Sequence, residues 1–168
     1  MSTVRDRRLQ SDHQRLAALV SRYPNKLKVE AARGNPPESY LLLIKGRGIA
    51  AVNRDLPTYC TEQRLRVELP AEYPAVPPLV TVLGPIFHPH VWPRSNVVCT
   101  GSWNITEPLD QLVLRLSSLI FYDPEQLNWR SVANQAAADW ASRNRNLFPL
   151  DLLVETGRER AHNWCESA

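Results

Sequence analysis

Lysine is almost missing from this chain, which has 17 Arg but only three Lys, at positions 26, 28 and 45. No lysine follows residue 45, so most of the chain offers no side-chain amine to an electrophile. Such a surface suits a protein that carries a reactive acyl group, because the lysine amine is a nucleophile. A codon bias toward arginine explains the same pattern, and both interpretations stay open.

Cysteine is also scarce, and Cys60, Cys99 and Cys165 form an odd number at wide spacings. This pattern fits reduced thiols better than a disulfide framework. No CxxC pair suggests zinc, and no glycine-rich phosphate loop occurs among the six Gly, so neither a metal nor another cofactor is expected. No apolar run reaches membrane-spanning length and residues 1–8 are no secretion signal, so we expect a soluble cytoplasmic protein with no membrane partner.

The net charge of +3 is too small to indicate a nucleic acid partner, but the charge is unevenly spread. Residues 1–28 hold seven Arg or Lys against two Asp, whereas the remainder is net acidic. A basic N-terminal segment of this kind can steer an acidic protein partner. A solvated helix face is the other interpretation.

Hydrophobic periodicity predicts an α+β domain: one helix, a four-stranded antiparallel meander, a long loop and further helices. The expected helices span Arg5–Tyr23, Leu109–Phe121 and Ser131–Arg143, with Ser131 or Asn128 as the cap of the last, and the expected strands span Leu27–Ala32, Tyr40–Lys45, Gln63–Leu69 and Leu79–Leu83. We expect one domain over residues 1–145 and an extension of unknown role over residues 146–168.

The segment from Gly84 to Pro108 is too long for a simple connection in a compact domain, so it is a candidate functional loop. It contains His88, His90 and Cys99. A thiol is both a nucleophile and a leaving group, so Cys99 suits acyl exchange, although a lone cysteine is often a small buried apolar residue. A Cys–His hydrolase or a metal site at these side chains lacks a nearby orienting acid or fourth ligand in sequence.

Several motifs in this order resemble the ubiquitin-conjugating enzyme family. Leu69–Pro78 contains Tyr-Pro, two residues and then Pro-Pro, like the family's signature after its third strand. Ile86–Val91 resembles its Phe-His-Pro-Asn region, and Cys99 follows His88 by eleven positions, about where the family keeps its acceptor cysteine. Within Leu69–Pro78, Tyr73 is expected to cover the edge of the core, and the Pro77–Pro78 bond is a candidate cis bond.

The likeness continues beyond the cysteine. Trp103 and Pro108 resemble the Trp and Pro that follow the family's cysteine, and Asp123-Pro124 resembles the Asp-Pro that ends its next helix. The resemblance spans roughly residues 5–143 and implies the ubiquitin-conjugating-enzyme-like fold.

Two departures refine the resemblance: His90 stands where the family has Asn, and the interval from Cys99 to Trp103 is shorter than in the usual eukaryotic members. In both features the chain is similar to conjugating-enzyme-like proteins of bacterial operons, which also encode a ubiquitin-like protein, an activating enzyme and a deconjugating protease. A role in anti-phage defence is a further expectation of that setting.

The resemblance implies a transferase that accepts a ubiquitin-like protein on Cys99, as a thioester, from an activating enzyme and passes it to an amine of a target protein. It implies that His90 donates a hydrogen bond to the oxyanion formed during transfer, unless His90 only braces the loop. His88 is the third candidate site residue, expected mainly to hold the turn beside Pro89. The basic first helix is the expected contact for the activating enzyme.

The same resemblance leaves other roles open. Asp123 and Glu125 are candidates to assist the attacking amine, although Asp123 alternatively just closes its helix. Phe87, Trp92 and Trp103 either form a groove for the modifier's tail or anchor the loop on the core. The alternative for the whole chain is a non-catalytic adaptor on the same fold, like the inactive variants and RWD domains, which would bind a ubiquitin-like protein or an activating enzyme.

Overall fold

The computed structural model describes residues 1–151, so Cys165 and most of the expected C-terminal extension lie outside the described residues. The helices are α1 (Val4–Arg22), α2 (Leu109–Ile120) and α3 (Gln135–Arg143), with a 3₁₀ turn at Arg145–Leu147, and the strands are β1 (Leu27–Gly34), β2 (Pro37–Asn53), β3 (Leu56–Glu68) and β4 (Leu79–Val82). The strands form an antiparallel sheet in the order β1-β2-β3-β4. The α+β fold with this order of elements is therefore confirmed.

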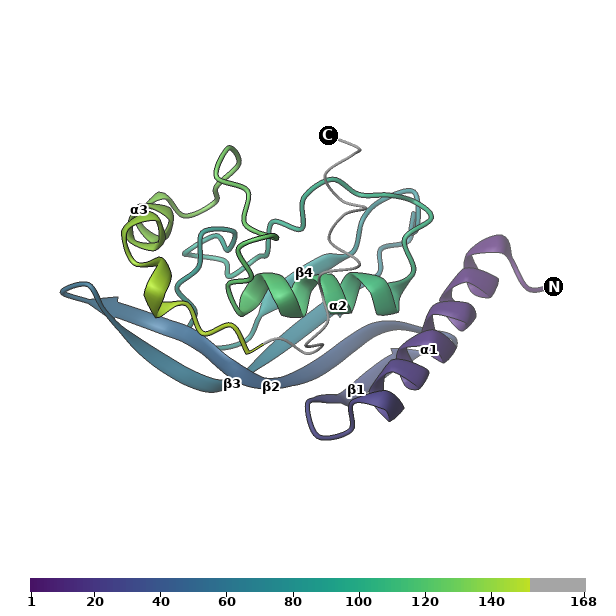
Figure 1. Cartoon of the computed structure of the whole chain (residues 1–168). Helices are drawn as coiled ribbons and strands as arrows, with labels where there is room; N and C mark the ends of the chain where they lie inside the picture. Colours follow the sequence, from purple (N-terminus) through teal and green to yellow (C-terminus); the bar gives the residue numbers. More distant parts are fainter. Residues whose placement is uncertain (152–168) are drawn as a thin grey trace.

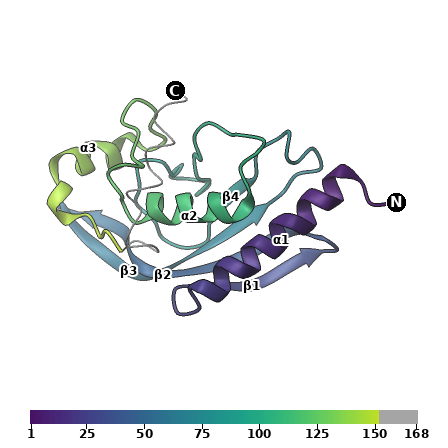
Figure 2. The same cartoon turned by 45° about the vertical axis from the view of Figure 1, so that its right-hand side comes forward.

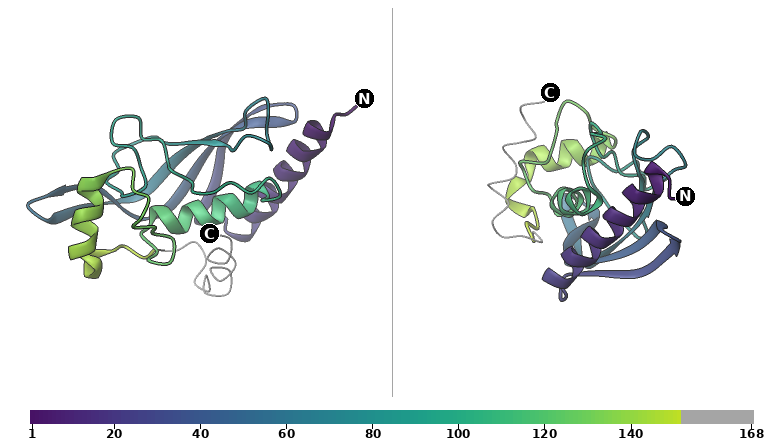
Figure 3. Two further views of the ribbon diagram at one scale, coloured as in Figure 1. Left: turned by 90° about the horizontal axis from the view of Figure 1, so that it is seen from above. Right: turned by 90° about the vertical axis from the view of Figure 1, so that its right-hand side faces the viewer.

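The helices lie on one face of the sheet (Figure 1). Figure 2 and the two further views in Figure 3 show α2 over the middle of the sheet, with α1 beside one end and α3 near the tip of the long β2–β3 hairpin. The core lies between α2 and the sheet and includes Leu42, Ile44, Leu65, Val67, Val82, Leu112, Val113 and Leu116. Within residues 1–151, no helix is long and apolar enough to cross a membrane.

The predicted first helix is confirmed almost residue for residue. Thr3 caps its N-terminus by accepting a hydrogen bond from the Asp6 amide, while the Asp6 carboxylate accepts one from the Thr3 amide. Leu9 and Leu16 bury one stripe of the helix in the core, as the periodicity predicted. The helix ends before Pro24, whose ring disfavours helical backbone at the preceding residue.

A buried carboxylate joins α1 to the start of α2. Asp12 is 1% exposed, and its Oδ1 accepts the Leu109 N–H at 3.0 Å. Its Oδ2 accepts the Tyr73 hydroxyl at 2.6 Å and the Arg8 Nε–H at 2.8 Å. The N-cap residue Pro108 makes no side-chain cap bond, so Asp12 from another helix satisfies one of the orphan amides of α2. Tyr73 is 1% exposed and belongs to the buried core.

The β2–β3 hairpin is longer than predicted, and this corrects the interpretation of residues 46–62 as a connection. Gly46 and Gly48 interrupt the alternation, but they lie at register irregularities inside paired strands. The tip residues Arg54 and Asp55 both have positive φ, at 49° and 62°. Two-residue turns of this kind usually contain Asn-Gly, so Arg-Asp gives no sequence signal for the turn. Cys60 falls between the strands expected at Tyr40–Lys45 and Gln63–Leu69, in what would have been a connection, but it belongs to β3.

Two further predictions were wrong in detail. The last helix begins at Gln135 with Asn134 as its N-cap, not at Ser131 with Ser131 or Asn128 as cap; the Asn134 side chain accepts the Ala137 N–H. The cis bond in the proline-rich segment is Tyr73–Pro74, and Asn35–Pro36 is also cis.

The Asp12 cluster leads to a stability prediction. Asp12→Ala should lower the free energy of unfolding by about 3–5 kcal/mol, because it removes the carboxylate that pairs with the part-buried Arg8 guanidinium and is the side-chain acceptor of the Leu109 amide. Arg15→Gln is the matched control, since it removes the exposed ion pair to Asp110 and should cost less than about 1 kcal/mol. Urea unfolding measures both, and equal small losses would contradict a stabilising role for the buried carboxylate.

Candidate active site

His88 lies in the centre of the site and is fully buried. Its Nδ1 accepts the His90 N–H at 3.0 Å, so Nε2 carries the ring proton and donates to the Leu119 carbonyl at 2.7 Å. The Tyr122 ring packs against the imidazole with centroids 4.6 Å apart. Burial, helped by the neighbouring His90 and opposed by the bond to Leu119, lowers the pKa of His88 to about 3. His88 is therefore a neutral imidazole with both nitrogens bonded to backbone.

His90 is 4% exposed and contacts the segment after α2. Its Nε2 accepts the Asn128 N–H at 3.0 Å. Burial lowers the pKa of His90, while a hydrogen bond to the Ser131 backbone opposes the shift. A neutral ring that accepts at Nε2 has no proton there to donate, so this side chain is arranged as a link between two loops.

The backbone of Cys99 is held by His90, because the Cys99 N–H donates to the His90 carbonyl at 2.7 Å. The segment before it is paired on both sides: Val98 forms a bridge to Val91 and donates its N–H to the Val80 carbonyl of β4. The Cys99 side chain is partly exposed and its thiol is free. Cys99 is therefore a partly exposed residue on a backbone that is held in place.

The loop after Cys99 is held by two arginines. Arg115 of α2 donates to the Thr100 carbonyl and forms a two-pronged ion pair with Glu107, with both distances 3.1 Å. These two charged side chains are only 10% and 4% exposed. From the other side, Arg8 of α1 donates to the carbonyls of Ile105, at 2.7 Å, and Glu107. The irregular segment is thus ordered by side chains from α1 and α2.

The acidic candidates Asp123 and Glu125 lie in the turn that follows α2. Asp123 is 9% exposed, and its Oδ1 accepts the Glu125 N–H at 3.0 Å. Burial is the main cause that raises the pKa of Asp123, with the nearby Glu125 adding to it. These contacts match the alternative in which Asp123 closes the end of α2, and no hydrogen bond within residues 1–151 joins Asp123 or Glu125 to Cys99.

The loop aromatics divide into anchors and one exposed ring. Trp103 donates its Nε1–H to the Pro74 carbonyl at 2.7 Å and packs on Tyr73. Phe87 packs edge-on against Trp140 at 6.1 Å. Anchoring is therefore confirmed for Trp103 and Phe87, whereas Trp92 is 51% exposed and is open to a partner.

Sequence reasoning missed Arg115, Glu107 and Asn128 as site residues. Arg115 and Glu107 are ordinary charges on a helix and a loop, and only the folded chain brings them together. Asn128 was considered as a helix cap, but its backbone N–H contacts His90. The sequence contains no periodic or local pattern that marks such contacts.

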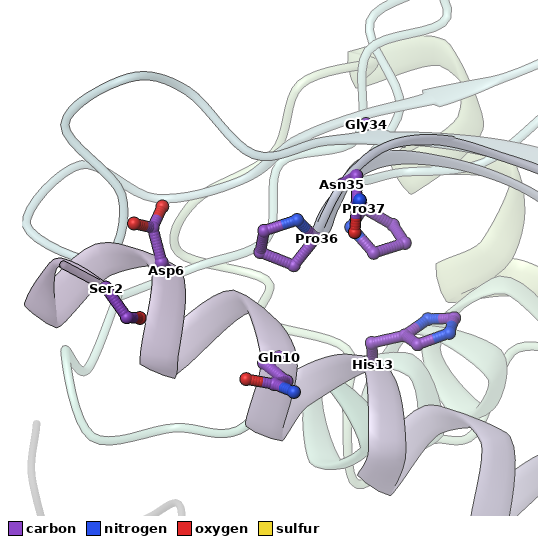
Figure 4. A pocket seen from close by; sticks show the side chains of 8 residues that line it. All are labelled: Ser2, Asp6, Gln10, His13, Gly34, Asn35, Pro36 and Pro37. Atoms are coloured by element: carbon purple, nitrogen blue, oxygen red, sulfur yellow. The ribbon is translucent and has the colours of Figure 1, made fainter.

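Other places in the fold do not extend the site. Among the described residues, no group of three or more His, Cys, Asp or Glu is arranged to hold a metal ion. A surface cavity of about 510 Å³ lies between α1 and the β1–β2 turn. The side chains that line it include Asp6, Gln10, His13 and Asn35 (Figure 4). None of its lining residues belongs to the loop of Cys99, so the cavity is separate from the thiol.

The buried His88 leads to a pH prediction. A histidine in the unfolded chain has a pKa near 6.5, so below that pH the unfolded state binds a proton that folded His88 does not bind until about pH 3. The free energy of unfolding is therefore unaffected by the titration of His88 above about pH 6.5. Between about pH 6.5 and pH 3 it falls by about 1.4 kcal/mol for each pH unit of acidification. Measured by urea unfolding between about pH 7 and 5, the free energy of unfolding of the wild type should fall more steeply with acidification than that of His88→Gln. Identical slopes would contradict a neutral His88.

With this geometry in place, the chain can be compared with known proteins. The profile of the family described as ubiquitin-conjugating enzyme matches residues 59–152 of 168. A candidate ubiquitin-conjugating enzyme from Plasmodium yoelii has a similar structure, with a TM-score of 0.59 and 17% identity over 84% of this chain and 87% of that one. A candidate ubiquitin-conjugating enzyme from Trypanosoma cruzi has a TM-score of 0.61 and 15% identity over 85% and 93%.

At these identities the two structures support the fold alone. A comparison with curated proteins finds no significant match. The match to the family profile covers more than half of the sequence and includes the loop that carries Cys99. The chain belongs to the ubiquitin-conjugating enzyme family.

Proposed function

We propose that this protein accepts a ubiquitin-like protein as a thioester on Cys99 from an activating enzyme and transfers it to an amine of a target protein. The observation that carries the proposal is a free, partly exposed thiol on a backbone fixed by the His90 carbonyl. The family to which the chain belongs supports the class of reaction.

The chemistry needs only the thiol and a held acyl group. In the first step the Cys99 sulfur attacks the thioester carbonyl of the activating enzyme, a new C–S bond forms, and the enzyme's thiolate leaves. In the second step a target amine attacks that carbonyl, a C–N bond forms, and the Cys99 thiolate leaves while the amine's proton passes to water. A rigid backbone at Cys99 favours both steps because it fixes the carbonyl relative to its attacker.

We propose that His90 is a positioning residue rather than an oxyanion donor. Its Nε2 already accepts the Asn128 N–H, and its carbonyl accepts the Cys99 N–H. The imidazole therefore connects the segment after α2 to the cysteine. His88 acts one step further away in this proposal, because it holds the His90 amide.

The basic surface of α1 supports a contact with the activating enzyme. Arg8 and Arg15 are engaged with Asp12 and Asp110, but Arg7 and Arg22 are exposed to solvent. Exposed positive charge of this kind accelerates encounter with an acidic partner and is weakened by salt. We propose that this helix contacts the activating enzyme first.

We further propose that the protein belongs to the bacterial branch of the family. His90 in place of the family's Asn and the short interval to Trp103 support that placement. The proposal places the chain in a reducing compartment, the cytoplasm, where a thiol such as Cys99 stays available for acyl exchange.

The alternative is a non-catalytic adaptor on the same fold. A buried Cys99 would have favoured it, so the partial exposure of Cys99 counts against it. Acyl transfer to the Cys99 thiol therefore distinguishes the transferase from the adaptor.

The first prediction concerns the thioester itself. Incubated with activating enzyme, ubiquitin-like protein and ATP, the wild type should form an adduct that thiol reductants remove on a gel. Cys60→Ser is the matched control, because Cys60 is a partly exposed free thiol in β3, and it should behave like the wild type. Cys99→Ser should form no reducible adduct, although a thiol-resistant ester would still mark this position. Absence of any adduct on the wild type would contradict the transferase proposal and favour the non-catalytic adaptor.

The second prediction separates the two roles of His90. His90→Ala should cost about 1–3 kcal/mol of stability, because the Asn128 N–H loses its acceptor, and should slow charging and discharge together. His90→Gln, whose amide oxygen can accept, should recover most of both. A loss of about 10²–10³ in discharge to free lysine, with stability and charging unchanged, would instead establish an oxyanion donor.

A further inference from the structure

The three lysines of the chain lie in or beside β1 and β2, on one side of the sheet. Lys28 is in β1, the edge strand, opposite Leu43 of β2. The Lys45 N–H in β2 donates to the Lys26 carbonyl at 2.8 Å, which places Lys26 beside the same strand. These lysines carry every side-chain amine of the 168-residue chain.

Cys99 lies beyond the opposite edge. The segment that leads to it pairs with β4 through the Thr81–Val97 bridge and the hydrogen bond from Val98 to Val80. Neighbouring strands are about 4.8 Å apart, so this segment is about 19 Å from β1 and about 14 Å from β2 across the sheet. The five bonds from a lysine Cα to its Nζ reach only about 6 Å.

Between residues 84 and 130, which include the loop of Cys99, every Lys or Arg position is an arginine. Arg115 donates to the carbonyl of Thr100, directly after the cysteine. Arg94 is exposed in the turn between the paired residues Val91 and Val98. Arg130 is exposed two residues after Asn128, which contacts His90. An arginine guanidinium stays protonated and offers no amine nucleophile at neutral pH.

We propose that this arrangement protects the acyl group on Cys99 from the chain itself and so directs transfer to an amine of another protein. The proposal rests on the proposed thioester function. The reaction that it excludes is self-transfer, in which the neutral amine of a lysine of the same chain forms a C–N bond to the thioester carbonyl. The C–S bond breaks to release the Cys99 thiolate, and one proton of the nitrogen passes to water. Arginine keeps the local positive charge without providing this nucleophile.

The test introduces amines at constant charge. In a full-length Cys60→Ser/Cys165→Ser background, Cys99 is the only thiol and can be loaded from a Gly-Gly peptide as its mercaptoethanesulfonate thioester. The variant Arg94→Lys/Arg130→Lys, the near pair, adds two amines, one in the turn that leads to Cys99 and one in the segment that contacts the His90 side chain. The variant Arg22→Lys/Arg33→Lys, the far pair, adds two amines in α1 and β1. Mass spectrometry then separates the reducible thioester from a reductant-resistant amide at lysine. Cys99→Ser versions of both variants measure direct acylation of lysine by the peptide.

The near pair should form the resistant amide at residue 94 or 130 at least about tenfold faster than the far pair, because a local amine has an effective concentration in the millimolar range. The background protein should lose its thioester by hydrolysis without self-modification. Equal rates in the two variants, or self-transfer to the natural lysines of the background protein, would overturn the inference. Failure of Cys99 to load at all would instead count against the proposed function.

Discussion

The site depends on the hydrogen bonds of one tripeptide, His88-Pro89-His90. The His88 imidazole joins the Leu119 carbonyl of α2 to the His90 amide. The Pro89 carbonyl accepts two amides at the entry to α3, and the His90 carbonyl accepts the amide of Cys99. Because buried polar groups are costly when they lose their partners, this network fixes two helices and the cysteine in one geometry. Imidazole suits the position because one ring can join two separated backbone groups.

A second constraint comes from buried charge. Arg8 and Arg115 hold the segment between Cys99 and α2 from opposite sides, and Asp12 and Glu107 neutralise them. A long loop without secondary structure would normally be mobile, but these contacts satisfy its carbonyls in place of a regular ladder. The hydrogen bonds from Arg8 to the Ile105 and Glu107 carbonyls connect α1 to the loop, so the helix proposed to contact the activating enzyme is also part of the support of the active-site loop.

Much of the fold could be predicted because periodicity reports burial directly. The stripe that contains Leu9 and Leu16 and the apolar face of α2 allowed the first two helices to be placed within one residue. The β2–β3 hairpin was underestimated because Gly46 and Gly48 interrupt the alternation, and because its tip is anchored from elsewhere: the Trp140 indole donates to the Asp55 carbonyl. Tertiary contacts of this kind leave no local pattern.

The candidate site was predictable in outline only. Motif order identified the loop and Cys99, and the sequence alone offered both roles for His90. The contact that favours the bracing role in our proposal is made to the backbone amide of Asn128, which is distant in sequence. The ion pair of Arg115 and Glu107 likewise depends on how the loop folds back on α2. A sequence motif specifies residue types, whereas these contacts are made by the three-dimensional packing.

The most direct test of the central claim locates the acyl group. The protein is charged by its activating enzyme, quenched in acid to preserve the thioester, digested without reductant and analysed by tandem mass spectrometry. The account predicts the C-terminal peptide of the modifier on the fragment that contains Cys99, sensitive to hydroxylamine. Modification of Cys60 or Cys165 instead, with Cys99 unmodified, would contradict the assignment of this site.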